Sequence, residues 1–342
     1  MAFDCIARDA SGRERGGYRR RVSSRSRVFS LVTLAAVVAS GVVVVGVLAT
    51  RGHIPGSAKP RSGHPPLSLA LGDRADREAR ELDKAQRFYA AKNYDGAAAI
   101  FNRYSSLEAQ VGTALAAWPS GSIQRLETLQ AANPRSALVA LHLGLAYYWD
   151  RREDDALAAW RRAAQQQPDT PYAVRAGDFL HPQYAAGLPR FVPSFQPPLR
   201  IRVLPGPQQV AALRADAAHG DAHAKILYGT ALQQLGQPLS AERQFEAAAR
   251  LAPNDPDARV AAAVGRFDKA SPAVAFGKLG PLTRVFPNAQ TVRFHLGLLL
   301  LWSAQVKEAR KQLEQARRED PDSLLGKQAT QYLEALGRIG TG

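Results

Sequence analysis

The stretch LGLAYYWDRREDDALAAWRRAAQQQP, residues 143–168, carries the clearest structural signal of the sequence. Its apolar residues recur at helical spacing on either side of a charged turn, which predicts two consecutive helices. Gly144 and Ala156 are small where the two helices would approach each other, and Trp160 is large enough to fill the space between them. Pro168 then ends the second helix. The stretch therefore predicts a hairpin of two closely packed helices.

The same pattern recurs further along the chain at a spacing of 34 residues. Prolines, small residues, alanines and bulky apolar residues each return at this step. The matching positions are Pro253, Pro287 and Pro321; Gly229, Ala263 and Gly297; Ala241, Ala275 and Ala309; and Phe245, Leu279 and Leu313. The segments ALHLGLAYYW (140–149) and RFHLGLLLLW (293–302) also share His-Leu-Gly-Leu and a tryptophan in one register. A chain with this periodicity predicts stacked helical hairpins.

These positions resemble the tetratricopeptide family, whose unit has Leu-Gly, an aromatic residue three positions on, and then Ala, an aromatic residue, Ala and Pro at fixed offsets. Residues 143–168 fit every one of these positions, and residues 228–253 fit nearly as well. A weaker unit over 85–104 begins the array. The resemblance covers residues 73–338 apart from one interruption. It implies an all-α solenoid of helical hairpins that winds into a right-handed superhelix.

The interruption is a proline-rich stretch, residues 181–208, that contains seven prolines. This density of proline is incompatible with a regular helix. We therefore expect an extended insertion between an N-terminal block over 73–180 and a C-terminal block over 209–338, the latter ending in a capping helix. The aromatic residues of the insertion favour contact with a surface of the solenoid, and a flexible linker is the alternative.

The residues before the repeats predict a membrane anchor. Residues 1–27 form a basic tail, and residues 28–50 carry no charge over 23 positions, which is enough for a helix to cross ~30 Å of hydrocarbon. A Pro/Gly-rich linker over 51–72 follows. The positive-inside rule places the tail in the cytoplasm and the repeats on the other side of the membrane. We expect a single-pass protein of the inner, cytoplasmic membrane, with a cleaved signal peptide as the alternative.

The formal net charge of +15 does not by itself predict binding to nucleic acid. Residues 1–61 hold eleven basic and three acidic side chains, and the charges of the remaining chain are interspersed along the expected helices. Arginine outnumbers lysine 36 to 9, which is typical of a GC-rich bacterial genome. The single cysteine, Cys5, excludes an intrachain disulfide.

The sequence contains no motif for catalysis or for a cofactor. It has no Walker-type loop, no Gly-x-Ser-x-Gly elbow, no His-Glu-x-x-His helix and no paired cysteines. His219 and His223 flank Asp221, but they lie at an expected helix boundary, where the fixed geometry of a metal site is not favoured. His142 and His295 occupy the same register, so we interpret them as parts of the repeat with at most an inner-face contact role. We predict no enzymatic activity, catalytic residue, cofactor or metal.

The resemblance also implies a binding surface. In the tetratricopeptide family the concave face is lined by the first helix of each hairpin, and partner peptides or helices lie there. The corresponding positions are Leu141, Leu145, Tyr148, Trp149, Ile226, Thr230, Gln233, Val260, Val264, Phe267, Phe294, Leu298, Leu301 and Trp302. An apolar strip of this size marks an interaction site if it is exposed. Alternatively it is covered within the molecule, by the insertion or by the other block, and the insertion is then a stand-in ligand that a partner displaces.

The predicted function is therefore a membrane-anchored scaffold that binds other proteins and no small-molecule substrate. An alternative is an assembly factor or chaperone-like subunit for envelope or secreted proteins. Its layout is similar to that of anchored repeat subunits of cytochrome c maturation and of ancillary repeat proteins of the secretory translocon. An enzyme with a site assembled across helices and a nucleic-acid-binding protein fit the sequence least.

Overall fold

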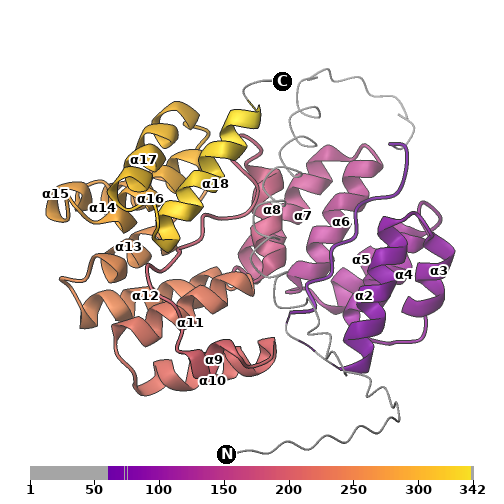
Figure 1. Ribbon diagram of the computed structural model, residues 1–342. Helices are drawn as coiled ribbons and strands as arrows, with labels where there is room; N and C mark the ends of the chain where they lie inside the picture. Colours follow the sequence, from indigo (N-terminus) through magenta and orange to yellow (C-terminus); the bar gives the residue numbers. More distant parts are fainter. Residues whose placement is uncertain (1–60, 73, 75, 340–342) are drawn as a thin grey trace, which may run out of the picture.

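The computed structural model describes residues 61–72, 74 and 76–339. Within this part of the chain the regular elements are helices, and no strand occurs. Figure 1 shows two groups of helices side by side, which we call the first block (76–180) and the second block (199–339). The predicted all-helical fold is confirmed. The predicted transmembrane segment 28–50 lies outside the described residues, and no helix within them is long and apolar enough to cross a membrane.

The first block consists of three helical hairpins and a closing helix. The hairpins are α2 (Arg77–Ala90) with α3 (Tyr94–Phe101), α4 (Leu107–Ala116) with α5 (Ser122–Ala132), and α6 (Ala137–Trp149) with α7 (Glu153–Gln166), and the closing helix is α8 (Pro171–Leu180). Each helix packs against the next one along the chain.

The second block repeats this arrangement after two additional helices, α9 (Leu199–Arg202) and α10 (Gly206–His219). Its hairpins are α11 (Ala222–Gln234) with α12 (Pro238–Leu251), α13 (Pro256–Gly265) with α14 (Ala273–Leu279) and α15 (Leu282–Val285), and α16 (Gln290–Trp302) with α17 (Val306–Glu319). Helix α18 (Leu324–Ile339) closes the block. As expected for a capping helix, Leu325 and Leu333 are buried against the last hairpin, whereas Lys327 and Glu334 are exposed.

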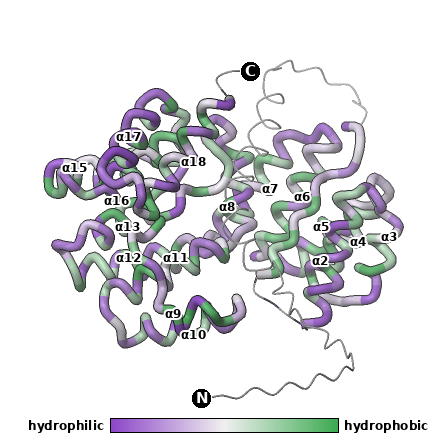
Figure 2. Tube along the Cα trace, viewed as in Figure 1, coloured by the Kyte–Doolittle hydropathy of each residue, from purple (hydrophilic) through white to green (hydrophobic). Residues whose placement is uncertain are grey.

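Local sequence fixes where the helices begin. Ser136 caps α6 by accepting a hydrogen bond from the backbone N–H of Val139 at 3.3 Å, and Asp221 caps α11 in the same way. Helices α12 and α13 have proline in their first turn. An N–H group at this position has no acceptor within the helix, so proline loses no hydrogen bond there. Along the helices in Figure 2 hydrophobic and hydrophilic residues alternate, as is typical of helices that bury one side.

The small residues of the repeat permit the close approach that the sequence predicts. A Cβ atom on Gly144 would lie 2.4 Å from Nε1 of Trp160, and one on Gly229 would lie 2.5 Å from Cε1 of Phe245. Both distances are well inside van der Waals contact, so only glycine allows the large ring of the second helix to lie this close to the first. The predicted pairing of a small residue with a bulky one is therefore confirmed in both blocks.

The middle hairpin of the second block departs from the predicted pattern. Its second helix, expected to run through Ala275 and Leu279, is divided into α14 and α15 at Gly280 and Pro281. Pro281 has no N–H to donate to a preceding turn, which ends α14. Leu279 is nevertheless fully buried and still fills the space between the helices of the hairpin.

Polar contacts join the two blocks. The carboxylate of Asp169, between α7 and α8, accepts hydrogen bonds from the backbone N–H groups of Leu239 (2.8 Å) and Ser240 (3.1 Å) and so caps α12. The buried ammonium group of Lys269 pairs with Asp178 of α8 and donates to a backbone carbonyl of the segment between the blocks at 2.6 Å. Because a buried charge needs such partners, these contacts fix one block against the other.

Candidate functional site

Two extended segments of the chain lie along the helices of the blocks (Figure 1). We call residues 61–72 the first strap and residues 185–196 the second strap. The first strap is the described part of the predicted linker 51–72, and it lies against the first block. The second strap belongs to the predicted insertion 181–208, which is extended up to Pro198. The prediction is wrong for the end of this segment, because α9 and the start of α10 are helical. The proline in the first turn of α10 is compatible with a helix, since its missing N–H would have no partner there.

Side chains of three helices in the first block hold the backbone of the first strap. The N–H of Ser68 donates to Nε2 of His142 on α6 at 3.1 Å, and the N–H of Leu69 donates to Oε1 of Gln86 on α2 at 2.6 Å. The N–H of Ala70 donates to the hydroxyl oxygen of Tyr172 on α8 at 3.0 Å. These bonds satisfy three consecutive backbone N–H groups of the strap, which would otherwise lie against the block without a partner.

The second strap is held in the same manner by the second block. The N–H of Phe191 donates to Oε1 of Gln233 on α11 at 2.9 Å, and the N–H of Val192 donates to Nε2 of His295 on α16 at 2.9 Å. The N–H of Ser194 donates to Oδ2 of Asp257 on α13 at 3.1 Å, and its hydroxyl donates to the same oxygen. The first block therefore binds an extended peptide of this chain through α2, α6 and α8, and the second block does so through α11, α13 and α16, the first helices of its hairpins.

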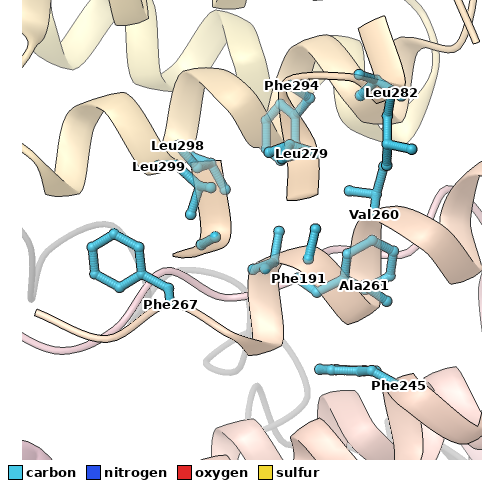
Figure 3. Packing of buried hydrophobic residues seen from close by; sticks show 14 of the residues in the cluster. Phe191, Phe245, Val260, Ala261, Phe267, Leu279, Leu282, Phe294, Leu298 and Leu299 are labelled. Carbon is cyan, nitrogen blue, oxygen red and sulfur yellow. The ribbon is translucent and has the colours of Figure 1, made fainter. Parts of the chain in front are cut away.

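Apolar contacts add to the backbone bonds of the second strap. Phe191 is 1% exposed and lies in one cluster with residues of α12, α13 and α16 (Figure 3). Its ring stacks on His295 with centroids 4.5 Å apart and meets Phe245 edge-on at 5.7 Å. The strap is thus part of the hydrophobic core of the second block.

The two histidines bind the straps as neutral rings. Nδ1 lies 2.8 Å from the carbonyl oxygen of Leu138 in His142 and 2.7 Å from that of Thr291 in His295, so Nδ1 carries the hydrogen and Nε2 accepts from the strap. Burial lowers the pKa of His142 to about 4 and the pKa of His295 to about 3, because desolvation disfavours the imidazolium. The positive charge of Arg175 lowers the pKa of His142 further.

In the first block, the predicted groove residues divide into two pairs. Leu141 and Leu145 are buried in the cluster between α6, α7 and α8 and do not line the groove. Tyr148 and Trp149 contact the start of the first strap instead. The guanidinium carbon of Arg61 lies 3.9 Å from the ring centroid of Tyr148, and the N–H of Arg61 donates to the carbonyl oxygen of Trp149 at 2.7 Å.

In the second block, most predicted groove residues come together in the cluster that also contains Phe191. Its predicted members are Ile226, Val260, Val264, Phe267, Phe294, Leu298 and Trp302, with Leu301 partly buried against them. Gln233 binds the strap, whereas the hydroxyl of Thr230 donates to the carbonyl oxygen of Ile226 at 2.9 Å. The apolar strip is therefore covered within the molecule, and binding of a partner by these residues stays a prediction.

Three polar residues that hold the straps are missing from the predicted groove. Gln86, Tyr172 and Asp257 each accept a backbone hydrogen bond, but a polar residue on a helix carries no sequence signal for this role. The shared register of His142 and His295 did carry such a signal. Their interpretation as repeat residues with an inner-face contact is confirmed by their bonds to the straps.

We call the surfaces that hold the first and second straps the first groove and the second groove. The second groove remains open where its strap leaves it. A cavity of about 570 Å³ lies at the first turns of α13, α16 and α18, with Phe195 of the strap on its wall. Asp255, Asp257 and His223 also line it, and Nε2 of His223 lies 3.1 Å from Oδ2 of Asp255.

The family comparison agrees with this architecture. The family model for the tetratricopeptide repeat matches residues 139–170, which include most of α6 and all of α7. These residues form a tetratricopeptide repeat, as the resemblance in the sequence implied. No curated protein matches the chain by sequence.

Several solved structures are similar to the chain at low sequence identity. YrrB, described as a TPR protein with an unusual peptide-binding site, is 13% identical, with 73% of this chain and 90% of that chain covered and a TM-score of 0.27. The TPR2AB domain of yeast Sti1 in complex with pHSP90 is 14% identical, with 78% and 98% covered and a TM-score of 0.30. Yeast Tom70 is 12% identical, with 82% and 68% covered and a TM-score of 0.29.

Proposed function

We propose that the chain is a non-enzymatic scaffold that binds extended segments of partner proteins in the grooves filled by its own straps. The observation that carries this proposal is the set of hydrogen bonds from strap backbone N–H groups to helix side chains, with His142 and His295 at its centre. A groove that binds backbone groups accepts an extended peptide of a different sequence, because every residue except proline offers the same N–H. The tetratricopeptide fold supports a role in protein interaction.

One property of the straps favours exchange with a partner, and another limits it. The straps contribute no regular secondary structure, so their release breaks no helix. Each strap is also joined covalently to its block, which gives it a high effective concentration at the groove. A partner segment must therefore compete with the tethered strap, and it needs a higher affinity than it would need for an empty groove. This competition favours specific partners over weakly bound ones.

We further propose that the scaffold acts at a membrane. The uncharged run 28–50 and the arginine-rich residues 1–27 support a single-pass anchor in the inner membrane, with the repeats on the extracytoplasmic side. Protease treatment of intact cells tests this directly. We expect the blocks to be digested only when the outer face of the membrane is accessible, and digestion from the cytoplasmic face alone contradicts the orientation.

Capture of partners from crosslinked membranes tests the scaffold itself. Leu69→Ser removes a strap side chain that is 7% exposed, which weakens the first strap without changing a helix. We expect this variant to capture more partner protein than the wild type, whereas Ser62→Ala, an exposed strap position, should capture the same amount. If Leu69→Ser leaves capture unchanged, the groove is not the binding surface. Partners that are envelope or secreted proteins under assembly would support the narrower role of an assembly factor.

A further inference from the structure

The two straps begin at equivalent places. The N–H of Arg61 donates to the carbonyl oxygen of Trp149 at 2.7 Å. The N–H of Ala185 donates to the carbonyl oxygen of Trp302 at 3.2 Å. Trp149 ends α6 and Trp302 ends α16, and each of these helices opens the third hairpin of its block. The first residue of each strap is therefore fixed at the same point of its block.

The straps also keep the same register along the groove. Seven positions after these first residues, Ser68 and Val192 donate their N–H groups to His142 and His295. The straps can thus be aligned without a gap, RSGHPPLSLALG (61–72) over AAGLPRFVPSFQ (185–196). Because the same two attachment points are joined by the same number of residues, positions that agree between the straps show what the groove requires.

Two backbone requirements are common to both straps. The third residue, Gly63 or Gly187, has a positive φ, 80° and 73° respectively, which residues with a side chain adopt only with strain. The fifth residue, Pro65 or Pro189, is buried in both straps. Proline fixes φ near −65° and so favours the extended conformation that follows. No atom lies within 4 Å of a Cβ built on either glycine, so the glycine is required for its backbone angle and not for space.

Apolar residues recur at every second position after the proline in both straps. An extended chain places every second side chain on one face. In the first strap, Leu67, Leu69 and Leu71 pack against the core of the first block. In the second strap, Phe191 and Phe195 pack against the core of the second block and Pro193 is buried, and Val192 between them packs against the same core. The intervening residues have little in common: Pro66 corresponds to Arg190, and Ser68 to Val192. The two straps therefore agree in this pattern and differ between its positions.

We infer that the grooves take extended segments of partner proteins in which Gly-x-Pro is followed by apolar residues, proline included, at every second position. This inference rests on the proposed function and defines the chemistry of its partner. The glycine makes the turn after the tryptophan carbonyl, the proline enters the groove, and the alternating apolar residues replace those of the strap in the core. One backbone N–H between them binds the neutral histidine.

The test uses the full chain with residues 63–71 replaced by a glycine/serine segment of equal length, which opens the first groove. The probe is a fluorescent peptide with the sequence of the second strap, residues 185–196, which shares the pattern with the first strap but differs from it at most other positions. We expect binding, detected by fluorescence polarisation, and about tenfold weaker binding of the peptide with Gly187→Val, because a β-branched residue is strained at positive φ. The peptide with Ala186→Val should bind as the parent does.

The outcomes separate this inference from the proposed function. If peptides with either strap sequence fail to bind the folded chain with its open groove, the proposed function is wrong. If the parent and Gly187→Val peptides bind equally well, partner binding stands and the required pattern is wrong. Formation of strap-exchanged dimers, seen by light scattering, in place of peptide binding would identify a second copy as the occupant and also overturn the inference.

A second variant keeps the inference testable if the strap-replaced chain does not fold. Gly63→Val in the otherwise unchanged chain weakens the first strap at an exposed position, and Ser62→Val is the matched control next to it. We expect the Gly63→Val chain to bind the probe peptide up to about tenfold more tightly than the wild type, because the strap competes less well. Equal binding by the two variants would show that the glycine is not required.

Discussion

Replacing Phe191 by alanine is expected to destabilise the second block strongly, although this residue lies in a segment without regular structure. Phe191 is 1% exposed, stacks on His295 with centroids 4.5 Å apart and contacts Phe245 at 5.7 Å. Deletion of a buried phenylalanine ring costs about 3–5 kcal/mol. A strap can shift toward the helices more easily than a helix can, which partly closes the cavity. We therefore expect a loss of about 3 kcal/mol, at the lower end of that range.

Urea unfolding at 25 °C, followed by far-ultraviolet circular dichroism, measures this loss. The matched control is Leu199→Ala, which removes an apolar side chain from the end of the same connecting segment where it is 65% exposed. We expect a change below about 0.5 kcal/mol for the control. A loss below about 1 kcal/mol for Phe191→Ala would show that the ring is not part of the core.

Because the folded pKa values of His142 and His295 lie below the usual 6.5, stability is full above pH 6.5 and falls as the pH drops toward 4. Unfolding free energies at pH 7 and pH 5 should differ by about 2 kcal/mol per histidine, and His295→Gln should remove its share. Gly229→Ala should cost about 1–3 kcal/mol in urea unfolding, since its Cβ would lie 2.5 Å from the Phe245 ring. Asp169→Ala should cost about 1 kcal/mol by leaving the start of α12 uncapped, and an unchanged thermal midpoint would contradict that role.

The helical hairpins are predictable from sequence because their signals are local. Gly144 and Trp160 are only 16 positions apart and belong to one hairpin, so their periodic recurrence is enough to identify the contact between them. The same reasoning locates the closing helix α18. The division between α14 and α15 is also visible in the sequence as Gly280-Pro281, although the 34-residue spacing alone predicts one continuous helix.

The contents of the grooves are not predictable in the same way. The bond between Ser68 and His142 joins residues 74 positions apart, and it uses a backbone N–H that every residue except proline has. The apolar residues of the inner face are compatible both with an exposed binding strip and with a strip covered by the chain. The two straps differ in sequence at most positions, so their common pattern is recognisable only once their bonds to Trp149 and Trp302 set the alignment.

Amide hydrogen exchange in the intact chain tests most directly whether the straps fill the grooves. The amides of Ser68, Leu69, Phe191 and Val192 all donate to helix side chains. We predict that, followed by NMR at neutral pH, they exchange at least about 100-fold more slowly than in an unstructured peptide, since exchange requires the strap to open. Exchange of these four amides at the unstructured rate, while the helices stay protected, would show that the straps do not fill the grooves.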